Sequence, residues 1–162
     1  MAVHNFSWII PDKLAGAALP GGIHAHLEDY ARSDLKELYD LGVRCLVSLT
    51  EMPAFFADAC GREGLQWISF PIDNFDVPRD DTAFSFLIGE IQNSIARGVP
   101  VCVHCFAGIG RTGMVLAAAT GRLLGLGGRE AILYIKERRT AFDTREQERY
   151  VSRFLDSGSI QS

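Results

Sequence analysis

Several features that would decide the class of this protein at once are missing from its 162 residues. No apolar run reaches the roughly 20 residues needed to cross a bilayer. The longest candidate, residues 114–126, is interrupted by Gly121 and Arg122. The first residues lack the basic region and long apolar stretch of a secretory signal. We therefore expect a cytoplasmic protein without membrane association.

An excess of positive charge is also absent. The chain has 16 Lys and Arg against 20 Asp and Glu, which gives a formal net charge of −4. An acidic chain has no overall attraction to nucleic acid or to an anionic membrane surface, so neither is expected as a partner. Recognition of any anion must therefore depend on a local cluster of residues.

Cysteines are few, and their spacing does not favour a metal site. Cys102 and Cys105 form a C-x-x-C pair with a histidine between them, but the chain has no second ligand pair at similar spacing for structural zinc. A redox dithiol normally opens a helix, whereas Cys102 lies in a β-branched run. We expect no metal and no cofactor, with Cys45 and Cys60 as buried thiols.

The chain has no internal repeats, low-complexity tract or interdomain linker. Strands are predicted at residues 7–10, 44–49, 65–70 and 99–103, and helices at 26–41, 53–62, 82–96, 112–124, 129–138 and 145–155. Residues 14–22, LAGAALPGG, form a glycine-punctuated segment with no assigned element. This order predicts an α/β fold with a short, mostly parallel central sheet flanked by helices. We expect one domain over residues 1–156 and a flexible tail over 157–162.

The stretch VPVCVHCFAGIGRTGMV, residues 99–115, carries the clearest chemical signal. Gly108 and Gly110 allow the backbone to bend so that its N–H groups converge. The helix that follows adds the positive end of its dipole, and Arg111 offers a planar fork for two oxygens of one phosphate. The loop has no Walker A pattern. The residues predicted to bind a dianionic tetrahedral group are Phe106, Ala107, Gly108, Ile109, Gly110 and Arg111.

Cys105 stands at the start of this loop. Converging N–H groups and a helix N-terminus favour a thiolate, which can attack phosphorus. Thr112 is expected to donate a hydroxyl hydrogen bond to the sulfur, and His104 to hold the loop through its ring nitrogens. A purely structural turn with a buried cysteine would explain the glycines, but not Arg111 opening an otherwise apolar helix.

The motif HCFAGIGRTG resembles the signature loop of the cysteine-dependent protein tyrosine phosphatase superfamily. The segments NFSWIIPDKLAGAALP and LGVRCLVSLTE resemble the opening of small, single-domain atypical dual-specificity phosphatases. The resemblance implies a phosphotyrosine-phosphatase-like fold, Cys105 as nucleophile, Arg111 as phosphate clamp, and a phosphocysteine intermediate without metal. The segment TREQERYVSRF is similar to the helix that carries a glutamine for positioning water and a loop, here Gln147.

The expected general acid departs from the family pattern. Such enzymes carry an aspartate in a mobile loop before the cysteine, here residues 71–81. Aligned on Phe75, the position of the acid holds Asn74, whose amide has no titratable proton. Asp73 and Asp76 flank it. In an extended segment Asp76 would share the face of Asn74, whereas a shift of one residue would bring in Asp73. Both stay candidates, and so does a slow enzyme in which both are solvated.

By analogy with the family, the short chain favours a shallow pocket. A shallow pocket would accept phosphoserine, phosphothreonine or aryl phosphates as substrates besides phosphotyrosine. We expect phosphoprotein or phosphopeptide partners and a monomer. A phosphoinositide or RNA 5′-phosphatase would need more cations, which residues 106–110 lack. Four arginines could rim the cleft or be solvated helix charges: Arg79, Arg138, Arg139 and Arg145.

Two other functions stay open as alternatives. One is a weakly active phosphate-binding module, which needs Arg111 but not Cys105. The other is a sulfurtransferase or an arsenate reductase, which also uses a loop cysteine.

Overall fold

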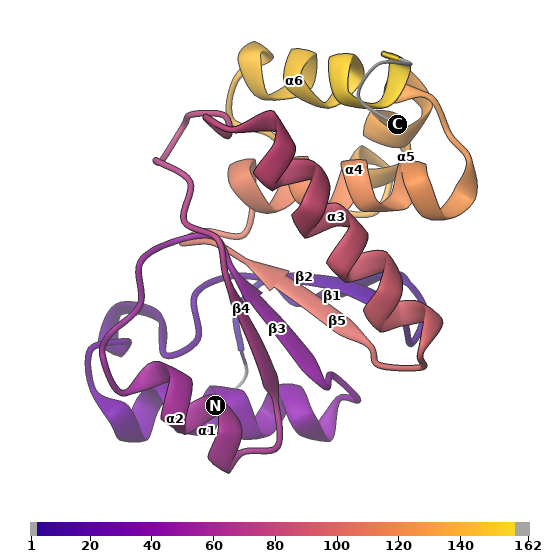
Figure 1. Ribbon diagram of the computed structural model, residues 1–162. Coiled ribbons are helices and arrows are strands. Elements are labelled where there is room, and N and C mark those ends of the chain that lie inside the picture. Colours follow the sequence, from indigo (N-terminus) through magenta and orange to yellow (C-terminus); the bar gives the residue numbers. More distant parts are fainter. Residues whose placement is uncertain (1–2, 158–162) are drawn as a thin grey trace.

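The computed structural model describes residues 3–157. In this part of the chain a five-stranded sheet runs in the order β1-β2-β5-β3-β4 (Figure 1). The strands are β1 (Ser7–Ile10), β2 (Leu14–Ala17), β3 (Cys45–Ser48), β4 (Gln66–Ser69) and β5 (Val101–His104). The edge strand β1 pairs antiparallel with β2, and the other pairings are parallel. The expected α/β class with a mostly parallel sheet is confirmed.

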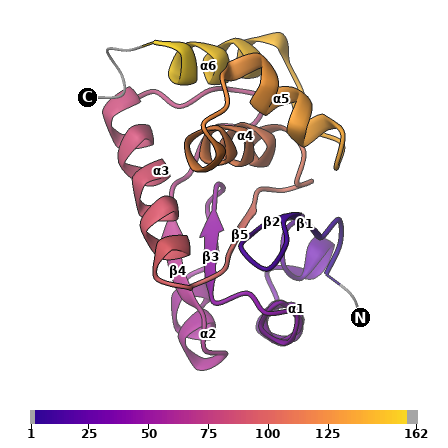
Figure 2. The ribbon, with the colours of Figure 1, turned by 90° about the vertical axis from the view of Figure 1, so that its right-hand side faces the viewer.

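Helices cover both faces of the sheet (Figures 1 and 2). They are α1 (Glu28–Asp40), α2 (Phe56–Arg62), α3 (Asp81–Ala96), α4 (Gly110–Leu124), α5 (Gly128–Lys136) and α6 (Arg145–Asp156), with a 3-10 turn, η1 (Gly22–His24). Helices α1 and α2 lie on one face, α3 and α4 on the other, and α5 and α6 pack outside α4. None of the helices within residues 3–157 is long and apolar enough to span a bilayer.

Alternation along β5 divides the core into two layers. Val101 and Val103 pack on the side of α3 and α4, while Cys102 packs on the side of α1 and α2. Cys105 belongs to the first layer, so the two cysteines are separated by the sheet. Burial raises the pKa of the Cys102 thiol to about 12. Cys102 is therefore a core side chain and not a dithiol partner of Cys105.

Strand β2 is the element that the sequence pattern did not predict. Its residues Leu-Ala-Gly-Ala are all buried, and Ala17 pairs with His104 at the end of β5. Gly16 is closely packed, because a Cβ there would lie 2.7 Å from Leu116 Cδ1 and 2.9 Å from Arg139 Nη1 and would displace these side chains. A strand of Ala and Gly lacks the β-branched residues that indicate a strand in a sequence. Its placement brings Leu19 beside the loop that follows β5.

The domain boundary at residue 156 stays a prediction. Of the expected tail, residues 157–162, only Ser157 is within the described residues.

Candidate active site

The loop at residues 105–109 lies at the carboxyl end of β5, where ligands commonly bind in parallel sheets. Helix α4 begins directly after it at Gly110, two residues earlier than expected. Gly108 has a φ of +79°, and a Cβ at that position would lie 2.5 Å from the carbonyl oxygen of Ala17. The turn therefore needs a glycine for both its backbone angle and its packing against β2.

Each carbonyl of this loop accepts a hydrogen bond, that of Cys105 from the preceding residue and those of residues 106–109 from other segments of the chain. The donors are His104 Nδ1 to Cys105 O at 2.9 Å, Leu19 N to Phe106 O at 2.9 Å, Asn5 Nδ2 to Ala107 O at 3.0 Å, Arg139 Nη2 to Gly108 O at 2.8 Å and Phe142 N to Ile109 O at 3.0 Å. The loop is thus anchored along its outer side. Sequence reasoning missed Asn5 and Leu19, because their contacts span most of the length of the domain.

The N–H groups of the same loop are unpaired. Within residues 3–157 no hydrogen bond is formed by the backbone N–H groups of residues 106–109. Since backbone N–H groups need an acceptor and these have none among the described residues, they are available to bind an anion. The Nε of Arg111 is likewise buried without a hydrogen-bond partner in this part of the chain. The loop is therefore a cluster of donors without a protein acceptor.

Cys105 lies at the start of this loop, and the residue is 2% exposed. As the sequence predicts, the hydroxyl group of Thr112 donates a hydrogen bond to its sulfur over 3.1 Å. A hydroxyl donor next to a sulfur stabilises negative charge on that sulfur. The contact joins the end of β5 to the first turn of α4.

His104 belongs to a buried chain of hydrogen bonds. The carbonyl of Cys105 can only accept, so His104 Nδ1 carries the proton and Nε2 accepts from the hydroxyl of Ser48 over 2.6 Å. Ser48 in turn accepts from Trp67 Nε1 over 2.8 Å. The pKa of His104 is lowered to about 4, chiefly by burial; the hydrogen bond to the Cys105 backbone opposes this shift, and the nearby charge of Arg111 adds to it. His104 is therefore a neutral positioning residue.

Two arginines support the site from inside the protein. Arg111 is 5% exposed and donates through Nη1 to the carbonyl of Ile72 over 3.0 Å, which fixes its guanidinium between the loop and the segment after β4. Arg139 donates to Gly16, Gly108 and Asn5 carbonyls and to the Ser7 hydroxyl. The sequence suggested that Arg139 either rims the cleft or is a solvated helix charge. Neither interpretation holds, because its side chain is buried and links three chain segments.

The acidic loop is not extended where Asp73 and Asp76 stand. Asp76 N donates to Asp73 O over 3.0 Å, and Phe75 has a φ of +65°. Residues 73–76 therefore form a turn, and the alternation argument that favoured Asp76 is wrong. The Asp76 carboxylate accepts from its neighbouring Val77 N over 2.7 Å. The Asp73 carboxylate pairs with Arg79 at the surface.

Gln147 is fully buried behind this turn. Its Nε2 donates to the carbonyl of Asp76 over 3.2 Å, and its Oε1 accepts from Asp143 N over 2.7 Å. Gly110 lies against both residues, and a Cβ on it would collide with the Asp143 carboxylate and lie 2.9 Å from Gln147 Oε1. Gln147 thus links the acidic loop to the start of α4.

A pocket of about 330 Å³ lies between Phe106 of this loop, Arg111 and the segments at residues 50–51 and 71–74, and we call it the anion pocket. Cys105 itself does not line it, but is the residue before Phe106. The residues that line it include Thr50, Glu51, Asp73, Asn74, Phe106 and Arg111. Asp73 is a lining residue and Asp76 is not. Among the described residues, Arg111 is the one cation that lines the pocket. No group of three or more His, Cys, Asp or Glu side chains within residues 3–157 is placed to hold a metal ion.

The class of cysteine-dependent phosphatases is defined by a cysteine at the end of a parallel strand, followed by a loop of N–H donors and a buried arginine. A family model described as "Polymorphic toxin system, DSP-PTPase phosphatase" matches residues 15–122, which is more than half of the chain. The protein belongs to this family of dual-specificity and tyrosine phosphatases.

Solved structures have the same fold over almost the whole chain. Tk-PTP in its active form is 23% identical with a TM-score of 0.80, over 94% of this chain and 97% of that chain. A kinase-associated phosphatase, KAP, with its catalytic-site cysteine replaced by serine is 20% identical with a TM-score of 0.81, over 98% and 97%. PTPMT1 in complex with PI(5)P is 19% identical with a TM-score of 0.75, over 96% of each chain.

Proposed function

We propose that the protein hydrolyses phosphomonoesters of phosphotyrosine, and of phosphoserine and phosphothreonine, through a phosphocysteine intermediate. One observation carries the proposal: the loop carbonyls of residues 105–109 all accept hydrogen bonds, whereas the N–H groups of residues 106–109 have no acceptor in the described chain. These donors match the equatorial oxygens of a phosphoryl group above Cys105.

The first step would be attack by the Cys105 thiolate on phosphorus. The bond from Sγ to phosphorus forms while the bond from phosphorus to the ester oxygen breaks. The loop N–H groups and Arg111 stabilise the charge on the equatorial oxygens, and a carboxylic acid gives its proton to the leaving oxygen. In the second step water attacks phosphorus, the carboxylate takes a proton from that water, and phosphate leaves with Cys105 regenerated.

Asp73 is our choice for this carboxylic acid. It lines the anion pocket together with Arg111, whereas Asp76 does not line it and binds the N–H group of Val77. Gln147 would hold the turn at residues 73–76 through the carbonyl of Asp76 and thereby position Asp73. Thr112 would stabilise the thiolate that leaves in the second step.

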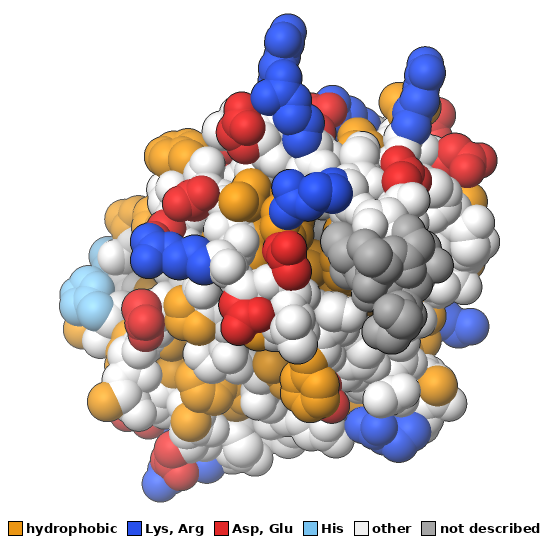
Figure 3. Space-filling view, turned by 45° about the horizontal axis from the view of Figure 1, so that its top comes forward, with side chains coloured by type: hydrophobic (Ala, Val, Ile, Leu, Met, Phe, Trp, Pro, Cys, Tyr) orange, Lys and Arg blue, Asp and Glu red, His pale blue; other side chains and the backbone are white. Residues whose placement is uncertain are grey.

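The charges around the anion pocket support a substrate with a single phosphate group. Arg111 is accompanied by two carboxylates, Glu51 and Asp73, among the lining residues. On the face shown in Figure 3, positive and negative side chains are interspersed rather than gathered into one basic patch. A phosphoinositide or an RNA 5′-end brings further phosphates and is disfavoured by such surroundings. We propose a phosphoprotein as the substrate for this reason.

A monomer in the cytoplasm is consistent with this chemistry. The four cysteines, Cys45, Cys60, Cys102 and Cys105, are free thiols. A thiol nucleophile needs a reducing compartment to stay active.

The test is a comparison of substrates and cysteine variants. Phosphate release is measured from a phosphotyrosine peptide, a phosphothreonine peptide and a soluble phosphoinositide. We expect the peptides to be hydrolysed faster, Cys105→Ser to abolish turnover, and Cys60→Ala, which removes a buried thiol elsewhere, to keep it. Undiminished turnover by Cys105→Ser refutes the mechanism, and preference for the phosphoinositide refutes the substrate class.

A further inference from the structure

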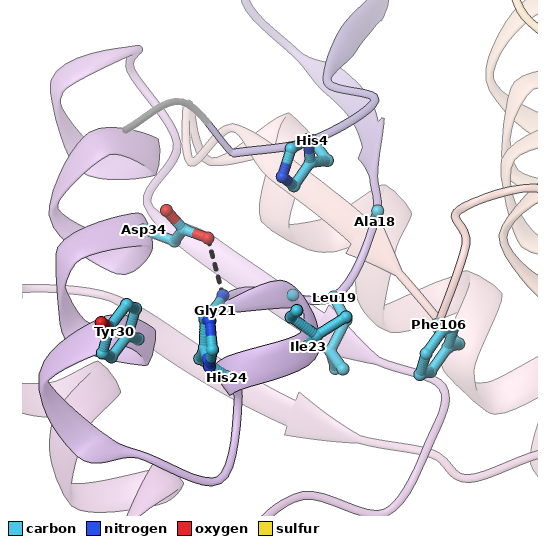
Figure 4. Close-up of a pocket in the computed structure, with 10 residues that line it drawn as sticks. His4, Ala18, Leu19, Gly21, Ile23, His24, Tyr30, Asp34 and Phe106 are labelled. Carbon is cyan, nitrogen blue, oxygen red and sulfur yellow. Dashed lines mark hydrogen bonds between the residues drawn. The ribbon is translucent and has the colours of Figure 1, made fainter.

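A second cavity adjoins the anion pocket, and we call it the apolar cavity (Figure 4). Its volume is about 580 Å³, and the side chains that shape it are His4, Leu19, Ile23, His24, Tyr30 and Phe106. Figure 4 shows Phe106, from the loop after β5, on one side and His24 and Tyr30 on the opposite side. The phosphatase mechanism uses none of these side chains.

Phe106 connects the two sites. Its side chain lines both the anion pocket and the apolar cavity, and it is 59% exposed. The hydrogen bond from Leu19 N to Phe106 O, at 2.9 Å, fixes the segment after β2 to the same residue. The two sites therefore meet at Phe106, the residue that follows Cys105.

The walls of the apolar cavity suit an uncharged, apolar group. No Lys or Arg lines it among the described residues, and the one carboxylate, that of Asp34, accepts from Gly21 N over 2.6 Å. The rings of His24 and Tyr30 are in contact, with their centroids 4.6 Å apart and their planes tilted by 40°. Ile23 is 82% exposed on the cavity wall, and burial of such apolar surface by a ligand is favourable.

We infer that the apolar cavity binds a large apolar side chain of the phosphoprotein substrate, close in sequence to the phosphorylated residue. The inference rests on the proposed function. Because Phe106 lines both sites and an extended chain advances about 3.3–3.6 Å per residue, we expect the apolar side chain within roughly three residues of the phosphoresidue. A polypeptide is favoured over a lipid because Arg111 is the one Lys or Arg among the described residues that line either site, and the Glu51 carboxylate beside it repels an anionic membrane surface.

The experiment uses phosphotyrosine peptides in which one phenylalanine is moved in turn through the three positions on each side of the phosphotyrosine, in an otherwise alanine and serine background. We expect one position to raise kcat/KM by about 10-fold over the alanine peptide. Ile23→Asp should remove this preference and leave the hydrolysis of p-nitrophenyl phosphate unchanged. The matched control is Phe86→Asp, which changes a residue that is 70% exposed on α3 and lines neither site.

The outcomes separate this inference from the proposed function. Turnover of p-nitrophenyl phosphate without any positional preference overturns the inference and leaves the phosphatase intact. Preference for long-chain over short-chain alkyl phosphates, without a peptide preference, assigns the cavity to an acyl group and also overturns it. If no ester is hydrolysed, the proposed function fails, and binding of the same peptides to Cys105→Ser then decides the inference. A preference retained in Ile23→Asp contradicts the assignment of the cavity.

Discussion

The neutral, buried His104 leads to a prediction about stability and pH. The pKa of His104 falls from an ordinary 6.5 to about 4 on folding, chiefly through burial. Between these two pH values the unfolded chain binds more protons than the folded one, so the free energy of unfolding decreases as the pH falls. The contribution is fully present above pH 6.5 and is lost as the pH approaches 4, for a total of about 3 kcal/mol.

The assay is urea unfolding of the parent and of His104→Asn at several pH values from 7.5 to 4.5. The asparagine amide keeps a donor for the Cys105 carbonyl but has no group that titrates in this range. We expect the variant to be less stable at neutral pH and to show a shallower loss of stability towards acid. The control is His26→Asn, at an exposed histidine. Parallel curves for the parent and His104→Asn would refute the account of His104.

Three further predictions concern the loop and its supports. Gly108→Ala should lower the free energy of unfolding by at least about 2 kcal/mol, measured by urea unfolding, and should abolish vanadate binding, measured by titration. The control is Gly98→Ala, at the same φ of +79° but with open space around it, which should show only the cost of the backbone strain. Arg139→Lys should lower kcat/KM by on the order of 100-fold because the Gly108 carbonyl loses its donor, and kcat/KM equal to that of the parent would contradict this. Asp73→Asn should lower kcat about 10²–10⁴-fold on an alkyl phosphate and remove the basic limb of the pH–rate profile, and if Asp76→Asn does so instead, our assignment of the acid is wrong.

The parts of the site that sequence could predict are local in the chain. Cys105, the glycine turn and Arg111 lie within seven consecutive residues, 105–111, so the spacing alone indicates how strand, loop and helix follow one another. The contact from Thr112 to Cys105 is predictable for the same reason, because both residues border one turn. Strands and helices with clear periodicity are also located to within about three residues.

The remaining parts depend on contacts that no local pattern encodes. Gly16 of strand β2 packs against Leu116 and Arg139, which leave little space for a side chain there. Both residues lie at least a hundred positions after Gly16 in the sequence. The choice between Asp73 and Asp76 depends on a turn in which Phe75, a bulky residue, adopts a positive φ. Such a conformation is rare outside glycine and asparagine, so the alternation expected of an extended segment does not apply to these residues.

The central claim is that the sulfur of Cys105 accepts the phosphoryl group. A phosphotyrosine peptide is mixed with the enzyme, the reaction is quenched in acid during turnover, and the digested protein is measured by mass spectrometry. Our account predicts one added phosphoryl group on the peptide that contains Cys105, and none in Cys105→Ser. Steady release of phosphate without that adduct, or an adduct on another residue, would contradict it.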